Sequence, residues 1–138
     1  MKLTAAMVMI ALAAAAPLSG SAQQAESEAT AAALAWLALL DGGDYEHSWS
    51  SAAQLFRASV EQPRWVKRVS RTRGMLGALQ SRQLLSATAA HSLPGAPDGE
   101  YYVLRYHSSF AKKAEATETV TPMKDEDGHW RVSGYYIK

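Results

Sequence analysis

Side chains that could support catalysis or metal binding are scattered along this sequence and do not form motifs. The four histidines, His47, His91, His107 and His129, show no His-x-His or His-Glu-x-x-His spacing, and the chain has no cysteine. Dedicated zinc sites usually draw their ligands from such spacings. The sequence therefore predicts no metal site and no cofactor. His107 and His129 remain able to meet across neighbouring strands, which lie only about 5 Å apart.

The string Ser109-Phe110-Ala111-Lys112 has the Ser-x-x-Lys spacing of penicillin-recognising enzymes. In those enzymes the lysine lies one helical turn from the nucleophilic serine and activates it. Here the string follows a predicted strand, and the companion Ser-Asp-Asn and Lys-Thr-Gly signatures are missing from the sequence. We interpret the string as a chance match.

The stretch DYEHSWSSAAQLFR, from Asp44 to Arg57, combines carboxylates, an imidazole and hydroxyls. Asp44 suits a helix N-cap, because its carboxylate can accept from the free N–H groups of the next turn. An apolar stripe at helical spacing follows it, made of Tyr45, Trp49, Ala52, Ala53 and Phe56. We therefore interpret this stretch as a capped amphipathic helix, with His47 on its polar side. A catalytic role would need a partner from elsewhere.

Basic residues dominate the segment that follows. Between Arg57 and Arg82 only Glu61 opposes the cations Arg57, Arg64, Lys67, Arg68, Arg71, Arg73 and Arg82. Four of them share one face of a predicted helix, at positions i, i+3, i+4 and i+7: Arg64, Lys67, Arg68 and Arg71. This basic stripe is either a solvated surface or a site for an anionic lipid, a polysaccharide or an acidic partner.

The first 22 residues have the pattern of a cleaved signal peptide. Lys2 precedes an apolar run over residues 5–18, and Gly20-Ser21-Ala22 suits a signal peptidase. The apolar run is shorter than the roughly 20 residues of a spanning helix, and no second hydrophobic stretch follows it. We expect a periplasmic or secreted protein without a membrane span.

Residues 23–138 are enough for one domain with one modest core. The absence of cysteine excludes disulfides and a lipid-modified cysteine. The formal net charge of +1 includes Lys2, so the mature domain is formally neutral, which argues against nucleic-acid binding. The sequence leaves the oligomeric state open, a dimer included.

Three helices precede four strands in the predicted order. The first helix ends at Asp41-Gly42-Gly43 and carries an apolar face of Ala29, Ala33, Trp36, Leu37 and Leu40. The second begins after Asp44, and the third near Pro63. From Arg82 onward the hydrophobic period changes to two, and four segments read as antiparallel strands. We expect an α+β fold with the helices packed on a curved four-stranded sheet.

Particular positions of the predicted strands have a clear meaning. Tyr102, Leu104 and Tyr106 alternate onto one face of the second strand, and Trp130, Val132, Gly134 and Tyr136 onto one face of the fourth. Asp127-Gly128 predicts a hairpin between the last two strands. Pro122 predicts a bulge or an early end in the third strand, because it lacks the N–H that a ladder needs.

Several long strings resemble a family of small exported bacterial proteins, domain of unknown function four-zero-one-nine. They are AWLALLDGGDYEHSWSSAAQLFR, LGAL, LPGAPDGEYYVLRYHSSFA and ETVTPMKDEDGHWRVSGYYIK. The resemblance covers nearly the whole mature chain, about residues 25–138. It implies no activity, no catalytic residue and no cofactor.

The order of helices and strands also resembles the cone-like fold of nuclear transport factor two and its relatives. That resemblance implies a pocket between the helices and a curved sheet. The residues expected to line it are aromatic: Trp36, Trp65, Tyr102, Tyr106, Trp130 and Tyr136. Packing of a hydrophobic core explains the same residues equally well.

Two functions fit these observations. The first is a noncatalytic binding or interaction module of the cell envelope, whose partner is a small apolar ligand or an anionic envelope component. The second is a small pocket enzyme of the isomerase or hydrolase type, which would need a buried acid or histidine with a shifted pKa in the pocket. The sequence names no such residue, so we favour the first.

Overall fold

Within residues 20–138, four helices are followed by four strands. The computed structural model describes residues 20–138, and most of the predicted signal peptide lies outside this range. The helices are α1 (Gly20–Asp41), α2 (Tyr45–Ser50), α3 (Gln54–Ser59) and α4 (Gln62–Leu76). The strands are β1 (Leu79–Ala90), β2 (Tyr101–Phe110), β3 (Lys113–Lys124) and β4 (Trp130–Ile137). The α+β class is confirmed, with four helices in place of three.

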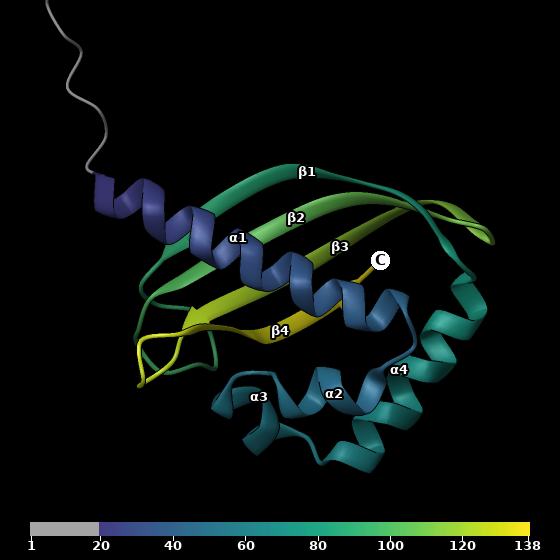
Figure 1. The fold of residues 1–138 in the computed structure, drawn as a ribbon, viewed down its shortest axis with the longest axis horizontal. Helices are drawn as coiled ribbons and strands as arrows, with labels where there is room; N and C mark the ends of the chain where they lie inside the picture. The colour runs from purple at the N-terminus through teal and green to yellow at the C-terminus, as the bar shows by residue number, and fades with distance from the viewer. Residues whose placement is uncertain (1–19) are drawn as a thin grey trace, which may run out of the picture.

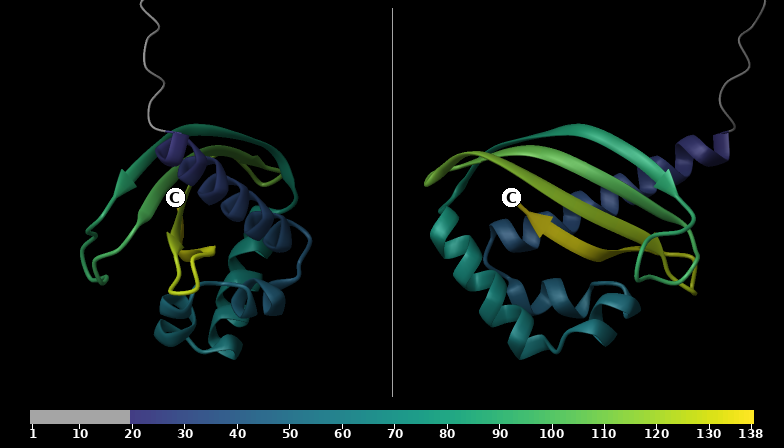
Figure 2. Two further views of the ribbon diagram at one scale, coloured as in Figure 1. Left: turned by 60° about the vertical axis from the view of Figure 1, so that its left-hand side comes forward. Right: turned by 180° about the vertical axis from the view of Figure 1, so that it is seen from behind.

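Helix α1 crosses one face of the curved sheet, and the shorter helices lie beyond β4 (Figures 1 and 2). It packs mainly on β3 and β4, and its buried residues are the five that were predicted: Ala29, Ala33, Trp36, Leu37 and Leu40. The alanines let the helix backbone approach the strands closely. The helix begins at Gly20, so it includes the predicted peptidase site. No helix within residues 20–138 is long and apolar enough to span a membrane.

Two residues end α1 and start α2. Gly43 adopts a φ of +78°, a left-handed conformation that favours glycine and commonly ends helices. Asp44 is the N-cap of α2, and its Oδ1 accepts from the His47 N–H at 3.4 Å. The predicted N-cap is confirmed.

The segment predicted as a single second helix forms α2 and α3. Helix α2 ends where the N–H and the hydroxyl of Ser51 both donate to the carbonyl of His47, at 2.9 and 2.7 Å. The Ala53 N–H then donates to the carbonyl of Val132 in β4 at 2.8 Å. The prediction of one helix is wrong because the chain bends here to meet the sheet.

The sheet is an antiparallel meander in the order β1-β2-β3-β4. The predicted hairpin at Asp127-Gly128 joins β3 to β4, with Gly128 at a φ of +84°. Strand β1 and strand β4 form the two edges, and the N-terminus of α3 bonds to the β4 edge. The other edge of the sheet, along β1, is therefore its open side.

A bulge lies at Pro122, as predicted. Thr121 pairs with Gly134 whereas Pro122 pairs with Val132, so Ser133 is an extra residue on β4. The hydroxyl of Ser133 donates to the Thr121 carbonyl at 2.8 Å. The bulge thus satisfies local polar groups while it shifts the strand.

This bulge reverses the alternation of side chains along β4. Tyr135 turns toward the helices, whereas Tyr136 lies on the outer face and is 62% exposed. The prediction that Tyr136 shares the inner face with Trp130 and Val132 is wrong, because a strict period of two does not survive an inserted residue.

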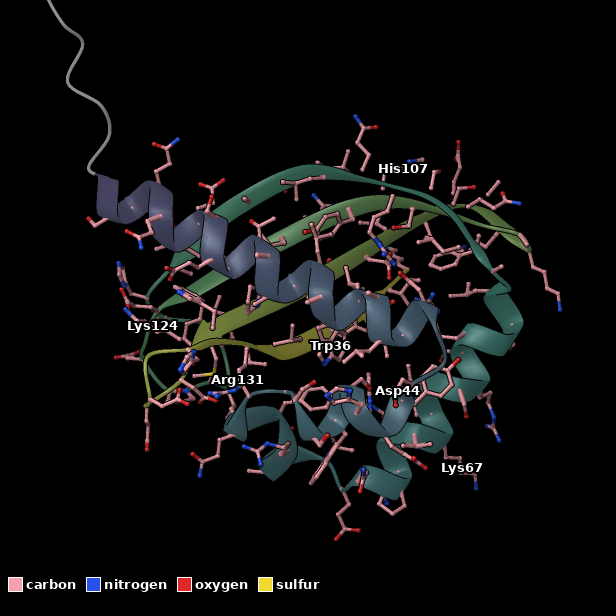
Figure 3. The ribbon with its side chains drawn as sticks, viewed as in Figure 1. Trp36, Asp44, Lys67, His107, Lys124 and Arg131 are labelled. Atoms are coloured by element: carbon pink, nitrogen blue, oxygen red, sulfur yellow. The ribbon has the colours of Figure 1, made fainter. Side chains whose placement is uncertain are left out.

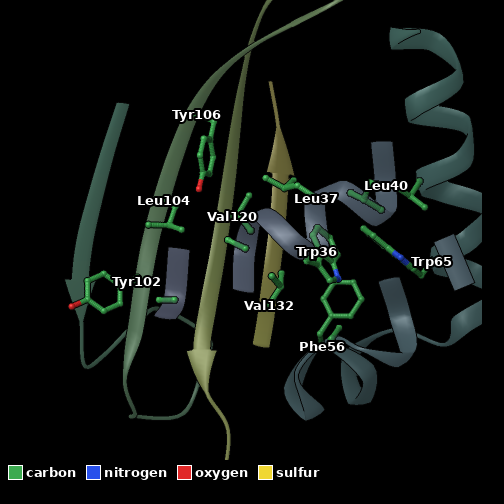
Figure 4. Close-up of a cluster of buried hydrophobic side chains, with 14 residues drawn as sticks. Trp36, Leu37, Leu40, Phe56, Trp65, Tyr102, Leu104, Tyr106, Val120 and Val132 are labelled. Carbon is green, nitrogen blue, oxygen red and sulfur yellow. The ribbon is translucent and has the colours of Figure 1, made fainter. Parts of the chain in front are cut away.

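Trp36 lies at the centre of the core (Figure 4). Its ring centroid lies 6.2 Å from that of Phe56, 5.9 Å from Trp65 and 5.4 Å from Tyr135. Its Nε1 donates to the Ser48 carbonyl at 2.7 Å, and the Trp65 Nε1 donates to the Ser48 hydroxyl at 2.9 Å. The core thus ties α1 to α2, α3, α4 and β4, and every buried indole N–H among these contacts is paired.

Candidate functional site

A groove of about 880 Å³ runs between α1 and the edge strand β1. Its walls carry mainly short or apolar side chains: Ala22, Ala31 and Leu34 from α1, Leu84, Ala87 and Ala89 from β1, and Tyr102 from β2. Alanines on both walls leave the space between helix and strand unfilled. The polar side chains of the groove, such as Gln23, Glu26 and Thr30, come from α1.

Two leucines on opposite walls of the groove are open to solvent. Leu34 is 45% exposed and Leu84 is 40% exposed. Single exposed leucines are common on protein surfaces, but apolar side chains that line a hollow together are typical of binding sites. The groove therefore presents apolar surface that no other part of residues 20–138 covers.

A smaller hollow of about 350 Å³ continues the groove past the first residues of α1. Ala22, Ala89 and Tyr102 line both hollows, which shows that they adjoin. The two hollows together form a trough along one side of the molecule.

The far end of this trough is polar. Three residues line it: His91 just after β1, Glu100 just before β2 and Lys124 at the end of β3. Lys124 Nζ lies 3.6 Å from Glu100 Oε2, and Figure 3 shows Lys124 at this end of the sheet. The trough thus combines an apolar body with a charged end.

Two of the six aromatic residues predicted to line a pocket lie at this trough. Tyr102 and Trp130 line the smaller hollow, with ring centroids 5.6 Å apart. Tyr136 lies on the outer face of the sheet. The remaining three are buried in the core: Trp36, Trp65 and Tyr106. The structure brings Tyr102 and Trp130 together at a cavity and separates them from the others.

The four residues of the basic stripe all lie exposed on α4: Arg64, Lys67, Arg68 and Arg71. Figure 3 shows Lys67 on the outer side of this helix. Within residues 20–138 no ion pair joins them to an acid. The stripe is an uncompensated positive surface.

Arg73 and Arg82, which belong to the same basic segment of the sequence but not to the stripe, turn inward and form an internal ion network with Asp41 and Glu118. Arg82 donates to both oxygens of Asp41, at 2.8 and 3.0 Å, and its Nε donates to Glu118 at 2.8 Å. Arg73 donates to Asp41 at 2.6 Å and lies 3.7 Å from Glu118. Two carboxylates are thus balanced by two guanidinium groups.

Two hydroxyls complete the shell of Glu118, which is fully buried. Ser108 Oγ and Tyr135 Oη each donate to its carboxylate at 2.5 Å. Burial, followed by the negative charge of Glu118, raises the pKa of Tyr135 far above its usual value. Tyr135 therefore stays protonated and remains a donor at neutral pH.

The internal ion network joins helices to every strand of the sheet. Asp41 ends α1, Arg73 belongs to α4, and Arg82 belongs to β1, while the acceptor Glu118 belongs to β3. Ser108 and Tyr135 add β2 and β4. Donors surround Glu118 on both oxygens, so the carboxylate has no side free to act as a base on a substrate. We interpret the network as a structural lock.

Sequence reasoning missed this network, although one signal for it was present. Glu118 alternates with Ala116 and Val120 on β3, so a strict period of two places it on the buried face. A buried carboxylate needs a cation nearby, and Arg82 lies in another strand, β1, of the same sheet. Asp41 gave no such signal, because a helix end is ordinarily solvated.

The residues with catalytic potential do not assemble into a reactive site. The four histidines are all exposed: His47, His91, His107 and His129. Ser109 lies in β2 and Lys112 in the turn to β3, so the lysine is not one helical turn from the serine. Within residues 20–138 no three histidine or carboxylate side chains gather closely enough to hold a metal ion.

Acid is expected to weaken the internal ion network through Asp41. Burial raises the pKa of Asp41, but hydrogen bonds and charges from Arg82 and Arg73 outweigh it, so the net pKa lies below the usual 3.8. A carboxyl with a lowered folded pKa stabilises the fold above its unfolded pKa and loses that contribution as the pH falls through the folded value. The free energy of unfolding, from urea titrations, should therefore fall from about pH 4 downward.

An Asp41→Asn variant isolates this contribution. It should be less stable than the wild type at pH 7, and its stability should fall less steeply below pH 4. Asp127→Asn is the comparison at an exposed position, where Arg131 also lowers the pKa of the carboxyl; because solvent screens that pair, the slope should change less than in Asp41→Asn. Equal slopes for the wild type and Asp41→Asn would contradict the assignment.

A family model described as Protein of unknown function (DUF4019) matches residues 32–135. The match runs from the middle of α1 almost to the end of β4, so it includes Leu34, Leu84 and the internal ion network. No curated protein and no solved structure matches the chain. The resemblance to nuclear transport factor two therefore stays a prediction.

Proposed function

Because the chain belongs to the DUF4019 family, whose description assigns no activity, we propose a function from the groove. The protein is an exported binding module that holds a small, largely apolar molecule between α1 and β1 and does not transform it. The groove carries this proposal, since its volume of about 880 Å³ falls within the roughly 300–1,000 Å³ of small-molecule sites.

The walls of the groove suggest the shape and chemistry of the ligand. Ala31 on α1 and Ala87 on β1 leave apolar space between helix and strand, which suits a hydrocarbon body. The polar end beside Lys124 and Glu100 suits a polar head group. An amphiphile that lies along the trough would satisfy both ends.

Export is the second part of the proposal. It is supported by Lys2, the apolar run over residues 5–18 and the small residues before Gln23, and it implies a periplasmic or secreted protein. Cleavage after Ala22 would remove part of the wall that both hollows share. It would also remove the Ala22 carbonyl, to which the Tyr102 hydroxyl donates at 3.3 Å. The mature groove would then be open at this end.

An enzyme remains the alternative, and its support is the polar end of the trough. His91, Glu100 and Lys124 could act there as acids or bases. All three are exposed, so water screens them, whereas catalytic groups are usually desolvated and held by partners. The geometry favours binding.

Filling the groove should weaken ligand binding. We expect the mature protein to bind a dansyl-labelled undecanoic acid saturably, and Ala31→Phe to bind it at least about tenfold more weakly, equivalent to ~1.4 kcal/mol. The added ring would occupy the space between Ala31 and Ala87. Fluorescence titration measures the Kd.

Ala38→Phe is the matched control, because Ala38 is also exposed on α1 but lies two turns beyond Ala31 and outside the groove. It should bind the probe as the wild type does. A wild type that binds no probe, or an Ala31→Phe variant that binds it equally well, would refute the groove as the site.

A further inference from the structure

We propose that α4 is a membrane-contacting surface, whose basic stripe binds the anionic phospholipid head groups of a bilayer. The surface consists of Arg64, Lys67, Arg68 and Arg71 together with Met75. This surface is separate from the groove, so the proposal does not depend on the ligand proposed for the groove.

The stripe has the geometry to meet a plane. Arg64 and Arg71 are seven residues apart, which corresponds to about 10 Å along the helix axis. Helix α4 lies at one end of the molecule in Figure 1 and in the right-hand view of Figure 2. An array of cations along an outermost helix can reach a flat surface without interference from the rest of the fold.

The charges of the stripe are available for a partner. Arg73, on the same helix, is buried against Asp41, whereas the stripe has no acidic partner within residues 20–138. Two acids lie near its start: Glu61 is exposed and precedes the helix, and Glu46 of α2 lines a hollow together with Lys67. Arg73 is therefore neutralised inside the fold, whereas the four cations of the stripe are exposed to solvent.

Apolar groups beside the cations favour a bilayer over a soluble polyanion. Met75 is 65% exposed and lies four residues beyond Arg71 on the same line of the helix. Pro63 and Val66, together with Lys67, line a hollow of about 550 Å³ beside α2. Apolar side chains flanked by cations can enter the interfacial region of a membrane, and a polysaccharide offers them nothing comparable.

The charge distribution would also orient the molecule. The hairpin between β3 and β4 carries Asp125, Glu126 and Asp127, and it lies at the opposite end of the molecule from α4 (Figures 1 and 3). Arg131 pairs with Asp125 and Asp127 there, so most of the hairpin's negative charge is balanced locally, whereas the cations of α4 are not. A negatively charged surface would therefore attract the α4 side more strongly than the hairpin end.

Cosedimentation with vesicles tests the proposal. The mature wild type should bind vesicles of phosphatidylglycerol and phosphatidylcholine and should not bind vesicles of phosphatidylcholine alone. Raising the salt to about 0.5 M should release it. The double variant Arg68→Glu/Arg71→Glu should bind at least about twenty-fivefold more weakly, at roughly fivefold for each cation lost.

Arg105→Glu/Lys113→Glu is the matched control, since it makes the same charge change at exposed sites of the sheet. It should keep its binding, and circular dichroism should show both double variants folded. Met75→Ser should weaken binding without changing its salt dependence. Equal loss in the control, equal binding to neutral vesicles, or binding to alginate without binding to anionic vesicles would each overturn the proposal.

Discussion

Replacing Arg82 with methionine is expected to lower the free energy of unfolding by about 3–5 kcal/mol. The substitution removes the guanidinium that donates to Glu118 at 2.8 Å and to both oxygens of Asp41. Glu118 is fully buried, and its closest remaining cation, Arg73, lies 3.7 Å away without a hydrogen bond. Urea unfolding of the mature protein at pH 7 measures the loss.

A double-mutant cycle separates the interaction between Arg82 and Glu118 from the effect of losing either side chain alone. Arg82→Met/Glu118→Gln should be more stable than Arg82→Met alone, because the uncompensated buried charge is then gone. Arg71→Met, on the exposed stripe, should change stability by less than about 0.5 kcal/mol. A loss below about 1 kcal/mol for Arg82→Met would show that the internal ion network does not stabilise the fold.

Trp36→Ala is expected to cost about 3–5 kcal/mol. The substitution leaves a cavity among Phe56, Trp65 and Tyr135, and it removes the donor to the Ser48 carbonyl. Because α1 forms one wall of the groove, the same variant should bind the dansyl probe poorly even under conditions in which it remains folded. Thermal and urea unfolding measure the stability.

Leu34→Ala provides the comparison on the same helix. Leu34 is 45% exposed, so its loss should lower stability by less than about 1 kcal/mol, although it lines the groove and should weaken probe binding. A Trp36→Ala variant as stable as Leu34→Ala would contradict the central place of Trp36 in the core.

Regular periodicity made much of the fold predictable. The buried face of α1 follows the helical spacing of Ala29, Ala33, Trp36, Leu37 and Leu40. The strands follow their alternation, and the last hairpin follows its Asp-Gly turn. These features depend on local backbone preferences and on one buried face, which a sequence displays directly.

Features that depend on contacts between distant segments were not predictable. The break between α2 and α3 requires the bond from Ala53 to Val132, and the pairing of Arg82 with Asp41 joins segments far apart in the sequence. Pro122 indicated a bulge, but the inserted residue falls on the partner strand, so its effect on Tyr135 and Tyr136 followed only from the register.

The groove was harder still to predict, because small side chains create it. Aromatic residues were predicted to line the pocket, yet three of the six fill the core and a fourth lies on the outer face of the sheet. Alanines such as Ala31 and Ala87 line the groove, and alanine in a helix or strand carries no signal of a site. Tyr102 and Trp130 lie at the trough because each stands at the start of its strand, β2 or β4, on the inner face and close to the first residues of α1.

Native mass spectrometry of the mature protein, purified gently from its own host, tests the central claim most directly. The groove predicts a reproducible bound small molecule on the wild type and on Ala38→Phe, and its loss from Ala31→Phe. A bare wild type, or a bound mass that Ala31→Phe retains, would contradict binding in the groove.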